Sequence, residues 1–285
     1  MEPKIWFITG TSKGFGREWT IAALERGDKV AASARDVSTL DDLAERFGDS
    51  LLALRLDVDD RASCFEAVHR ADEHFGGLDV IVNNAGYGLF GFLEELSEQD
   101  LRDQMATNFF GAMWVTQAAL PVLRRGGGGR ILQVSSVGGV CAFPMLGAYH
   151  ASKWALEGMS QALAQEVAPL NIKVTIIEPG GFATDWSGPS AKRATPLGDY
   201  DDLRQQVAEA RRRRFGIQGA PGDPAASAAA VLALVDAADP PLRIFFGDGP
   251  LAMATAEYET RLATWREWEP LSIAAHGSSG EETTG

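Results

Sequence analysis

Short apolar segments alternate with longer amphipathic segments along most of the chain. The apolar segments are rich in β-branched and aliphatic residues, which are typical of buried strands. They are Ile5–Thr9, Val30–Ala34, Leu51–Leu56, Val80–Val82, Ile131–Val134, Val174–Ile177 and Ile244–Phe246. The segments between them have the spacing of apolar residues that is typical of helices. This alternation predicts a single doubly wound α/β domain, in which helices cover both faces of a parallel sheet.

Glycines follow several predicted helices, and a glycine readily adopts the left-handed conformation that ends a helix. The helices with such an end are Gly16–Arg26, Arg61–Phe75 and Asp100–Arg125, and a further helix is predicted over Tyr149–Ala168. Pro121 lies inside the third of them, where proline is expected to kink or break the helix.

The pattern becomes looser after the sixth predicted strand. Residues 182–219 combine prolines with a charged helical stretch over Tyr200–Phe215, and a long insertion of this kind often forms a lid over a substrate. Residues 251–269 are predicted to form an additional amphipathic helix, which covers either the substrate cleft or an oligomer face. Residues 270–285 are rich in Ser, Gly, Glu and Thr and predict a mobile tail. The main domain is therefore expected to span residues 1–250.

Composition and charge narrow the possible functions. Hydrophobic residues make up 45% of the chain, which is typical of a protein with a packed core. The net charge of −13 repels phosphate backbones, so nucleic acid is not an expected partner, and the run Arg211–Arg214 is interpreted as a solvated helix face. The two cysteines are far apart and the four histidines lack metal-ligand spacing, so no metal site is expected. With no secretion signal and no membrane-spanning segment in the pattern, a cytoplasmic location is expected.

A glycine-rich loop joins the first predicted strand to the first predicted helix. Its sequence is Gly10-Thr11-Ser12-Lys13-Gly14-Phe15-Gly16. At the start of a βαβ unit, such a loop brings backbone N–H groups close to a diphosphate at the positive end of the helix dipole. Glycines also serve tight turns whatever the function. The position of the loop favours a dinucleotide site.

The end of the second predicted strand bears on the choice of dinucleotide. An acidic residue there would hydrogen-bond the ribose 2′-hydroxyl of NAD, but this chain has Arg35. Arg35 and Lys13 together offer two cations to a 2′-phosphate. The sequence therefore favours NADP(H), with NAD(H) as the less favoured cofactor. The alternative is that both residues are ordinary surface cations.

Candidate catalytic residues lie near the middle of the chain. Tyr149 and Lys153 are four residues apart in a predicted helix, so one face carries both, and an ammonium there stabilises a phenolate. Ser135 and Ser136 end a predicted strand, and such ends border the crevice where ligands of parallel sheets bind. Asn108 lies inside a predicted helix although asparagine is a poor helix former, which indicates a special role.

In combination, these residues resemble the classical short-chain dehydrogenases/reductases. The resemblance rests on Thr9-Gly10-x-x-x-Gly14-x-Gly16, Asn83-Asn84-Ala85-Gly86, Asn108, Ser136, Tyr149-x-x-x-Lys153 and Pro179-Gly180, in the order and spacing of that family. It covers roughly residues 4–185 and implies a Rossmann-type sheet and hydride transfer between a nicotinamide and a carbonyl or alcohol. The stretch from Ser135 to Gly158 is similar to the branch of 17β-hydroxysteroid and retinol dehydrogenases, which implies a bulky apolar ketone or alcohol.

The resemblance also implies a role for each catalytic residue. Tyr149 would be the general acid in reduction and the base in oxidation, and Lys153 would lower its pKa and hold the nicotinamide ribose. Ser136, or Ser135 in its place, would hydrogen-bond the substrate oxygen. Asn108 would hold a water that links Lys153 to solvent. Besides the glycine loop and Arg35, the residues implied to contact the cofactor are Asp57, Val58, Asn83, Ala85, Gly86, Pro179, Gly180 and Thr184.

The substrate and the assembly are less determined. Apolar residues beside these motifs are expected to form the substrate pocket, although core packing is an equally good explanation for each. They are Tyr87, Phe90, Val137, Phe143, Met145, Phe182 and Trp186. Family members are usually built as homodimers or homotetramers on the helices that correspond to Asp100–Arg125 and Tyr149–Ala168. The alternatives to a reductase are an NADP(H)-sensing protein without turnover and an epimerase or dehydratase of related fold.

Overall fold

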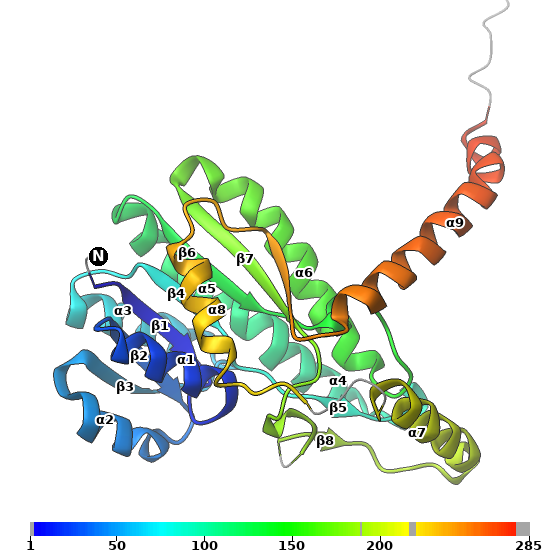
Figure 1. Ribbon diagram of the computed structural model, residues 1–285, viewed down its shortest axis with the longest axis horizontal. Helices are drawn as coiled ribbons and strands as arrows, with labels where there is room; N and C mark the ends of the chain where they lie inside the picture. Colours follow the sequence, from blue (N-terminus) through cyan, green and yellow to red (C-terminus); the bar gives the residue numbers. More distant parts are fainter. Residues whose placement is uncertain (1–2, 189, 217–220, 278–285) are drawn as a thin grey trace, which may run out of the picture.

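One parallel sheet of seven strands forms the centre of the computed structural model, which describes residues 3–188, 190–216 and 221–277 (Figure 1). Its strands are β1 (Ile5–Thr9), β2 (Lys29–Ala34), β3 (Leu51–Arg55), β4 (Val80–Asn83), β6 (Gly129–Val134), β7 (Ile172–Pro179) and β9 (Arg243–Phe246). They lie in the order β3-β2-β1-β4-β6-β7-β9, so the direction of winding reverses between β1 and β4. The predicted Rossmann-type α/β fold is confirmed.

Helices cover both faces of this sheet, and others lie away from it. In chain order, the α-helices of the described residues are α1 (Gly14–Glu25), α2 (Asp41–Phe47), α3 (Arg61–Phe75), α4 (Glu98–Met105), α5 (Ala112–Arg125), α6 (Gly147–Val167), α7 (Asp201–Gly216), α8 (Ser227–Asp236) and α9 (Pro250–His276). Apolar side chains of α1, α2 and α8 form one core with the sheet, and those of α3, α5 and α6 form a second core on the opposite face. Buried strands of this kind are hydrophobic on both faces, which explains their continuous apolar sequence.

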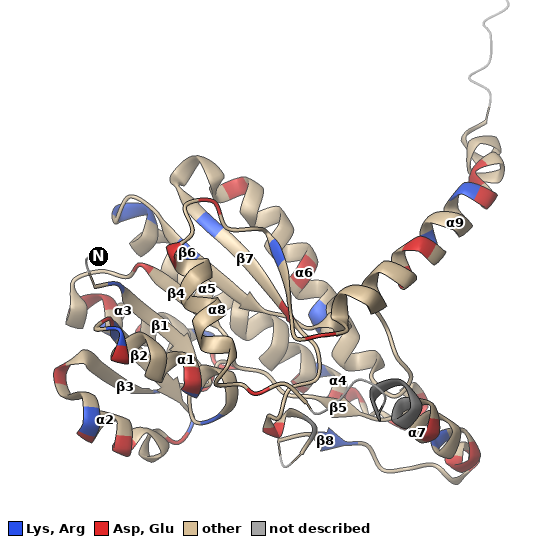
Figure 2. Ribbon diagram, viewed as in Figure 1, with Lys and Arg blue, Asp and Glu red and all other residues tan. Residues whose placement is uncertain are grey.

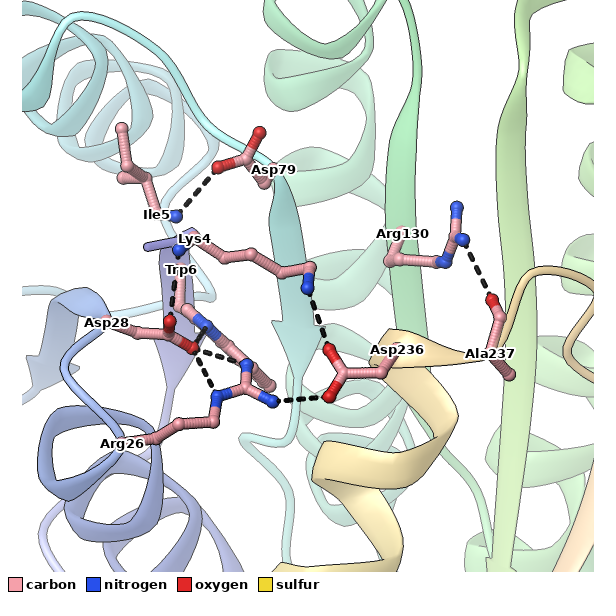
Figure 3. A network of polar contacts seen from close by, with 9 residues as sticks. All are labelled: Lys4, Ile5, Trp6, Arg26, Asp28, Asp79, Arg130, Asp236 and Ala237. Carbon is pink, nitrogen blue, oxygen red and sulfur yellow. Dashed lines mark hydrogen bonds and ion pairs between the residues drawn. The ribbon is translucent and has the colours of Figure 1, made fainter. Parts of the chain in front are cut away.

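The amino edge of the sheet is fastened by a network of charged side chains (Figure 3). The buried carboxylate of Asp28 accepts hydrogen bonds from the Lys4 backbone N–H at 3.0 Å, the Trp6 indole N–H at 2.8 Å and Arg26 Nε at 3.0 Å. Asp236, at the end of α8, accepts from Lys4 Nζ at 2.7 Å and from Arg26 Nη1 at 2.9 Å. The network joins β1, β2, α1 and α8 at the amino ends of the strands. The residues that the sequence predicts to be functional lie at the opposite edge, after the carboxyl ends of the strands.

The predicted helix over Asp100–Arg125 is in fact three consecutive segments. A π-helical turn, η4 (Ala106–Gly111), separates α4 from α5, and α5 continues through Pro121. Pro121 therefore does not break the helix, and the interruption lies at Asn108, inside η4. Single π-helical turns are frequent at functional sites.

Residues 182–216 contain more structure than an irregular lid. The two-residue strand β8 (Lys192–Arg193) pairs with β5 (Leu89–Phe90), and neither was predicted because two residues carry no periodic pattern. Tyr200 stacks on Phe92, and its hydroxyl donates to Glu94 Oε2 at 2.6 Å. These contacts hold α7 against the segment that follows β4. Residues 217–220, and the side chains of Arg211–Arg214, lie outside what the structure describes.

The C-terminal helix α9 extends away from the domain (Figure 1). It begins at Pro250, one residue before the predicted start at 251, and continues to His276, so residues 270–276 are helical and not part of a tail. Residues 278–285 lie outside the described chain. Met253 and Ala254, in its first turns, are buried against the segment after β6, whereas Trp265 and Trp268 are exposed. Acidic and basic residues are intermixed along α9 (Figure 2). Within the described residues, no helix is long and apolar enough to span a membrane.

Candidate active site

A cleft of about 1880 Å³ follows the carboxyl edge of the sheet. Residues that follow each strand of the sheet line it, as expected for ligand sites of doubly wound sheets. Of the predicted cofactor residues, those that line the cleft are Gly10, Ser12, Lys13, Gly14, Phe15, Arg35, Asp57, Val58, Ala85, Gly86, Tyr149, Lys153, Pro179, Gly180 and Thr184. Ser136 and all the predicted substrate residues line it as well.

The glycine loop is packed so tightly that side chains would not fit. Gly10 has φ +69°, and a Cβ there would lie 2.9 Å from Ala85 Cα. A Cβ on Gly16 would lie 2.5 Å from the Gly10 carbonyl oxygen. Helix α1 begins at Gly14 with no side-chain cap and no acidic residue in its first turn, so its free N–H groups and its dipole are available to an anion. The loop therefore fits the diphosphate of a dinucleotide.

The two cations expected at the 2′-phosphate differ in their surroundings. Arg35 is exposed and lines the cleft at the end of β2. Lys13 is about half exposed, and its ammonium forms an ion pair with Asp185 at 2.6 Å, in the segment that follows β7. Arg35 is thus the better placed of the two to meet a 2′-phosphate, because the charge of Lys13 is already paired.

Tyr149 lies in the first turn of α6 and is 4% exposed. Burial raises the pKa of Tyr149 to about 12, and a hydrogen bond with Ser136 only partly opposes this effect. The net shift of this pKa is therefore upward, and its lowering by Lys153 stays a prediction. The physical reason is that loss of water around the phenol disfavours the phenolate by more than its polar neighbours stabilise it.

Lys153 lies one helical turn after Tyr149 and is also buried. Its Nζ donates to the Val134 carbonyl oxygen at 2.8 Å and lies 5.9 Å from the centre of the Tyr149 ring. Burial lowers the pKa of Lys153 to about 8, although the charge of Glu157 raises it. An ammonium, a phenol and the Ser136 hydroxyl thus share one wall of the cleft.

Asn108 acts from behind the cleft wall. Its Oδ1 accepts from the Tyr87 backbone N–H, and its Nδ2 donates to the Tyr87 carbonyl oxygen, both at 3.0 Å. Nδ2 also donates to Ser152 Oγ at 3.1 Å. A Cβ on Gly86 would lie 3.1 Å from Asn108 Oδ1. The side chain therefore fixes the segment after β4 in place, and its amide groups are occupied by protein partners.

The substrate end of the cleft is aromatic. The Trp186 ring lies 4.9 Å from that of Tyr149 and 5.4 Å from that of Phe90, between ring centres. Trp186 belongs to the 3₁₀ turn η7 (Asp185–Ser187), and a Cβ on Gly88 would lie 2.9 Å from its ring. Met145 has φ +67°, a strained conformation for a residue with a side chain, and strain of this kind is often found at functional sites. These residues form an apolar surface directly beside the phenol.

The family model for short chain dehydrogenases matches residues 4–194 of the chain. This protein belongs to the short-chain dehydrogenase family. It is an oxidoreductase that acts on CH–OH and C=O groups with a nicotinamide cofactor, as its family and its relatives show. The predicted family and enzyme class are confirmed.

Relatives similar to this short-chain dehydrogenase match almost its whole length. "Oxidoreductase BOA17" of Botryotinia fuckeliana is 39% identical over 95% of this chain and 99% of its own. A solved short-chain dehydrogenase from Streptomyces avermitilis superimposes with a TM-score of 0.88 at 37% identity, over 96% of this chain and 98% of that chain. An alcohol dehydrogenase from Thermococcus sibiricus, complexed with 5-hydroxy-NADP, has a TM-score of 0.70 at 27% identity and covers 86% of this chain and 96% of its own.

Three predicted residues of this dehydrogenase lie outside the cleft wall: Gly16, Asn83 and Asn108. Asn83 is buried, and its Nδ2 donates to Thr116 Oγ1 at 2.9 Å. Thr116 belongs to α5, so this side chain points to the face of the sheet that α5 covers. Its neighbour Asn84 lines the cleft instead, and its Nδ2 donates at 2.9 Å to the carbonyl oxygens of Thr9 and Gly10. Successive strand residues point to opposite faces. The sequence alone could therefore have indicated that Asn83, the last residue of β4, and Asn84, the first loop residue, point in different directions.

Sequence reasoning also missed His150. Its ring bridges the substrate wall, with Nδ1 at 2.8 Å from the Gly138 carbonyl oxygen and Nε2 accepting from the Phe143 N–H at 2.8 Å. Burial lowers the pKa of His150, so the ring is neutral and holds the loop that carries Phe143. The signal available in the sequence was its position directly after Tyr149. Within the described residues, no group of three or more His, Cys, Asp or Glu side chains is arranged to hold a metal.

Proposed function

We propose that this short-chain dehydrogenase is an NADP(H)-dependent carbonyl reductase or alcohol dehydrogenase with Tyr149 as its general acid and base. The observation that carries the proposal is the group formed by the buried Tyr149 phenol, the buried Lys153 ammonium and the partly buried Ser136 hydroxyl in one wall of the cleft. Donors gathered where negative charge develops on an oxygen are what carbonyl reduction requires.

The cofactor supplies the hydride when it is bound, and the chain supplies its binding site. The N–H groups at the start of α1 and the glycine loop would hold the diphosphate. Arg35 would meet the 2′-phosphate, which is the reason that we favour NADP(H) over NAD(H). Asp57, Val58, Ala85, Gly86, Pro179, Gly180 and Thr184 would complete the site.

In the reducing direction, Tyr149 would donate its proton to the substrate oxygen as negative charge appears there. With a pKa of about 12 the Tyr149 phenol is protonated at neutral pH, as a proton donor must be, and Lys153 and Ser136 would favour its phenolate during transfer. The Ser136 hydroxyl, which hydrogen-bonds Tyr149, would orient the same oxygen. Ser135 is buried without a hydrogen-bond partner and is the weaker candidate for this role.

Lys153 would hold the nicotinamide ribose and favour a negative charge on Tyr149 once the proton has left. Asn108 would act by fixing the backbone of Tyr87 beside the substrate. We keep the relay through a water at Asn108 as part of the proposal, although its side-chain amide is engaged with Tyr87 and Ser152.

We propose a bulky apolar ketone or alcohol as the substrate. The aromatic and aliphatic surface around Trp186, Phe90 and Met145 supports this choice, since it offers dispersion contacts and few hydrogen bonds. The residues after β7, with α7, would form the lid over it. Membership in the branch of 17β-hydroxysteroid and retinol dehydrogenases stays a prediction.

We also propose a cytoplasmic homodimer or homotetramer that uses α4 with α5 and α6 as its contact surfaces. The large apolar side chains of Leu101, Phe110 and Trp154 on these helices are more than one third exposed, which supports a protein partner there. The two cysteines are buried and form no disulfide, in line with a reducing compartment.

A substrate panel tests the proposal. Oxidation of NADPH and of NADH is followed with ketones and aldehydes that range from small aliphatic compounds to compounds of steroid size. We expect turnover with NADPH that increases with apolar bulk. Tight NADPH binding without turnover of any carbonyl would favour a sensing protein, and conversion of a substrate without net oxidation of NADPH would favour an epimerase.

A further inference from the structure

A second group of buried polar side chains lies behind the catalytic wall, between α6, β7 and β9. Glu157 on α6 and Glu178 on β7 are 5% and 1% exposed. Nε of Arg243, on β9, lies 3.0 Å from Glu157 Oε2 and 3.5 Å from Glu178 Oε1. One guanidinium thus faces two carboxyl groups, and the cluster carries excess negative charge if both are ionised.

The hydrogen bonds of the two carboxyl groups indicate where a proton lies. Oε1 of Glu157 and Oε1 of Glu178 are both buried without a hydrogen bond, which is costly for two carboxylates. A proton on one group allows the two carboxyls to hydrogen-bond each other. Burial, and then the charge of Glu157, raise the pKa of Glu178 far above its usual range. Glu178 is therefore the protonated member, and Glu157, which accepts directly from Arg243, is the carboxylate.

Glu157 is also close to the catalytic lysine. It follows Lys153 by one helical turn on the same face of α6, and both side chains are buried. Its carboxyl reaches the segment that follows β6, because a Cβ on Gly139 would lie 3.0 Å from Glu157 Oε1 and 2.5 Å from Ser135 Oγ. The negative charge of Glu157 consequently acts on Lys153 through a region from which water is excluded, where charges interact strongly.

We propose that Glu157 is a positioning residue, the buried counter-ion that keeps Lys153 charged, and that Arg243 and the protonated Glu178 hold it ionised. The inference rests on the proposed function, because Lys153 would act by holding the cofactor. The titratable and charged groups packed around Glu157 are Lys153 on its own helix, Glu178 on β7 and Arg243 on β9, with Tyr258 of α9 across a cavity.

This cavity is in contact with one member of the carboxyl pair, Glu178. It has a volume of about 520 Å³ and lies at the foot of α9, lined by Glu178, Arg243, Gln161 and Tyr258 among others. Gln161 Oε1 accepts from Arg243 Nη2 at 3.0 Å, so the guanidinium is held between the carboxyl pair and the cavity. Water in the cavity would allow the pair to exchange its proton with the medium.

The test is NADPH affinity as a function of pH, measured by quenching of tryptophan fluorescence in the full chain. In the wild type we expect affinity to fall as the pH rises through about 8, where Lys153 loses its charge. In Glu157→Gln the fall is expected about one pH unit lower, because the counter-ion is gone. The matched control is Glu178→Gln, which keeps a neutral hydrogen-bond donor beside Glu157. In this variant, NADPH affinity is expected to decrease over the same pH range as in the wild type.

A purely structural role would give a different result. Glu157→Gln and Glu178→Gln would then both lose thermal stability, but their NADPH affinity would decrease over the same pH range as in the wild type. This result would overturn the proposal. An equal shift in Glu178→Gln would overturn it too, because Glu178 would then carry the charge. If Glu157→Gln does not fold, Arg243→Gln replaces it, with a smaller shift in the same direction expected and an unchanged fall as the contrary result. Because the readout is binding, an absence of carbonyl turnover would refute the proposed function without affecting this test.

Discussion

Polar groups are arranged in opposite ways at the two edges of the sheet. At the amino edge, Asp28 and Asp236 are saturated by the hydrogen bonds of Lys4, Trp6 and Arg26. At the carboxyl edge, the phenol of Tyr149 and the ammonium of Lys153 are buried with pKa values moved far from their usual ranges. Satisfied groups stabilise a fold, whereas groups kept in an unfavourable environment are free to interact with a ligand. The groups that stabilise the fold and the groups proposed to catalyse the reaction thus lie at opposite edges of the same sheet.

The largest expected effect comes from removing the proton donor at the carboxyl edge. In Tyr149→Phe we expect kcat to fall by about 10³-fold, because general acid catalysis typically contributes 10²–10⁴-fold. The melting temperature and NADPH affinity should stay close to the wild type, since the ring and its packing remain. Steady-state kinetics and thermal melting check both parts. A variant that keeps its rate would show that the proton comes from another group.

The amino edge should give the reverse result. Asp28→Asn removes the buried carboxylate that pairs with the partly buried Arg26 guanidinium, and we expect the free energy of unfolding to fall by about 3 kcal/mol. For a chain of this size, that lowers the melting temperature by roughly 5 °C while kcat is nearly unchanged. The control is Asp239→Asn, an ion pair with Lys173 in which the aspartate is 91% exposed and little change in melting temperature is expected. If kcat falls in Asp28→Asn at a temperature where the variant is folded, the amino edge also contributes to catalysis, and the contrast between the two edges is wrong.

A third variant examines the cofactor end of the carboxyl edge. Arg35→Asp should reduce the preference for NADPH over NADH by roughly 10–100-fold, because a charge-assisted contact worth about 1.5–3 kcal/mol is replaced by repulsion. The exposed Arg70→Asp on α3, outside the cleft, is the matched control. If the wild type binds NADPH and NADH with equal affinity, Arg35 does not select the cofactor and is an ordinary surface cation.

The smallest expected effect is the pH dependence. The pKa of Tyr149, about 12, keeps the phenol protonated throughout an ordinary assay, whereas that of Lys153, about 8, lies inside the assay range. The rate of carbonyl reduction should therefore decrease several-fold as the pH rises through about 8, as Lys153 loses its charge. A rate that increases over the same interval would indicate that a deprotonated group limits reduction.

The sequence predicted the carboxyl edge better than the segments that cover it. Strand β1 has the predicted bounds, and the glycine loop lies where its position predicted, because both depend on local rules of burial and backbone conformation. Asn108 was noticed as a poor helix former, and it lies in a π-helical turn. These features are encoded within a few neighbouring residues.

Other features depend on contacts between distant residues. The ion pair of Lys13 with Asp185 and the strand pair of β5 with β8 join segments far apart in the chain. The direction of the pKa shift of Tyr149 depends on burial by Trp186 and other neighbours, which spacing alone does not reveal. The helix α9 extends through Pro270 although composition predicted a tail from that residue. Tertiary packing overrides the local pattern in the ion pair, the strand pair and the pKa shift, whereas the end of α9 is exposed and is not held by packing against the domain.

The most direct test of the central claim is transfer of a labelled hydride. NADPH that carries deuterium at the reactive position of the nicotinamide is incubated with the enzyme and a bulky apolar ketone, and the product is analysed by mass spectrometry. We predict an alcohol that carries the deuterium on its new CH–OH carbon with the wild type, and almost none with Tyr149→Phe. Tight binding of NADPH without labelled alcohol for any carbonyl compound would contradict the assignment of reductase chemistry to this cleft.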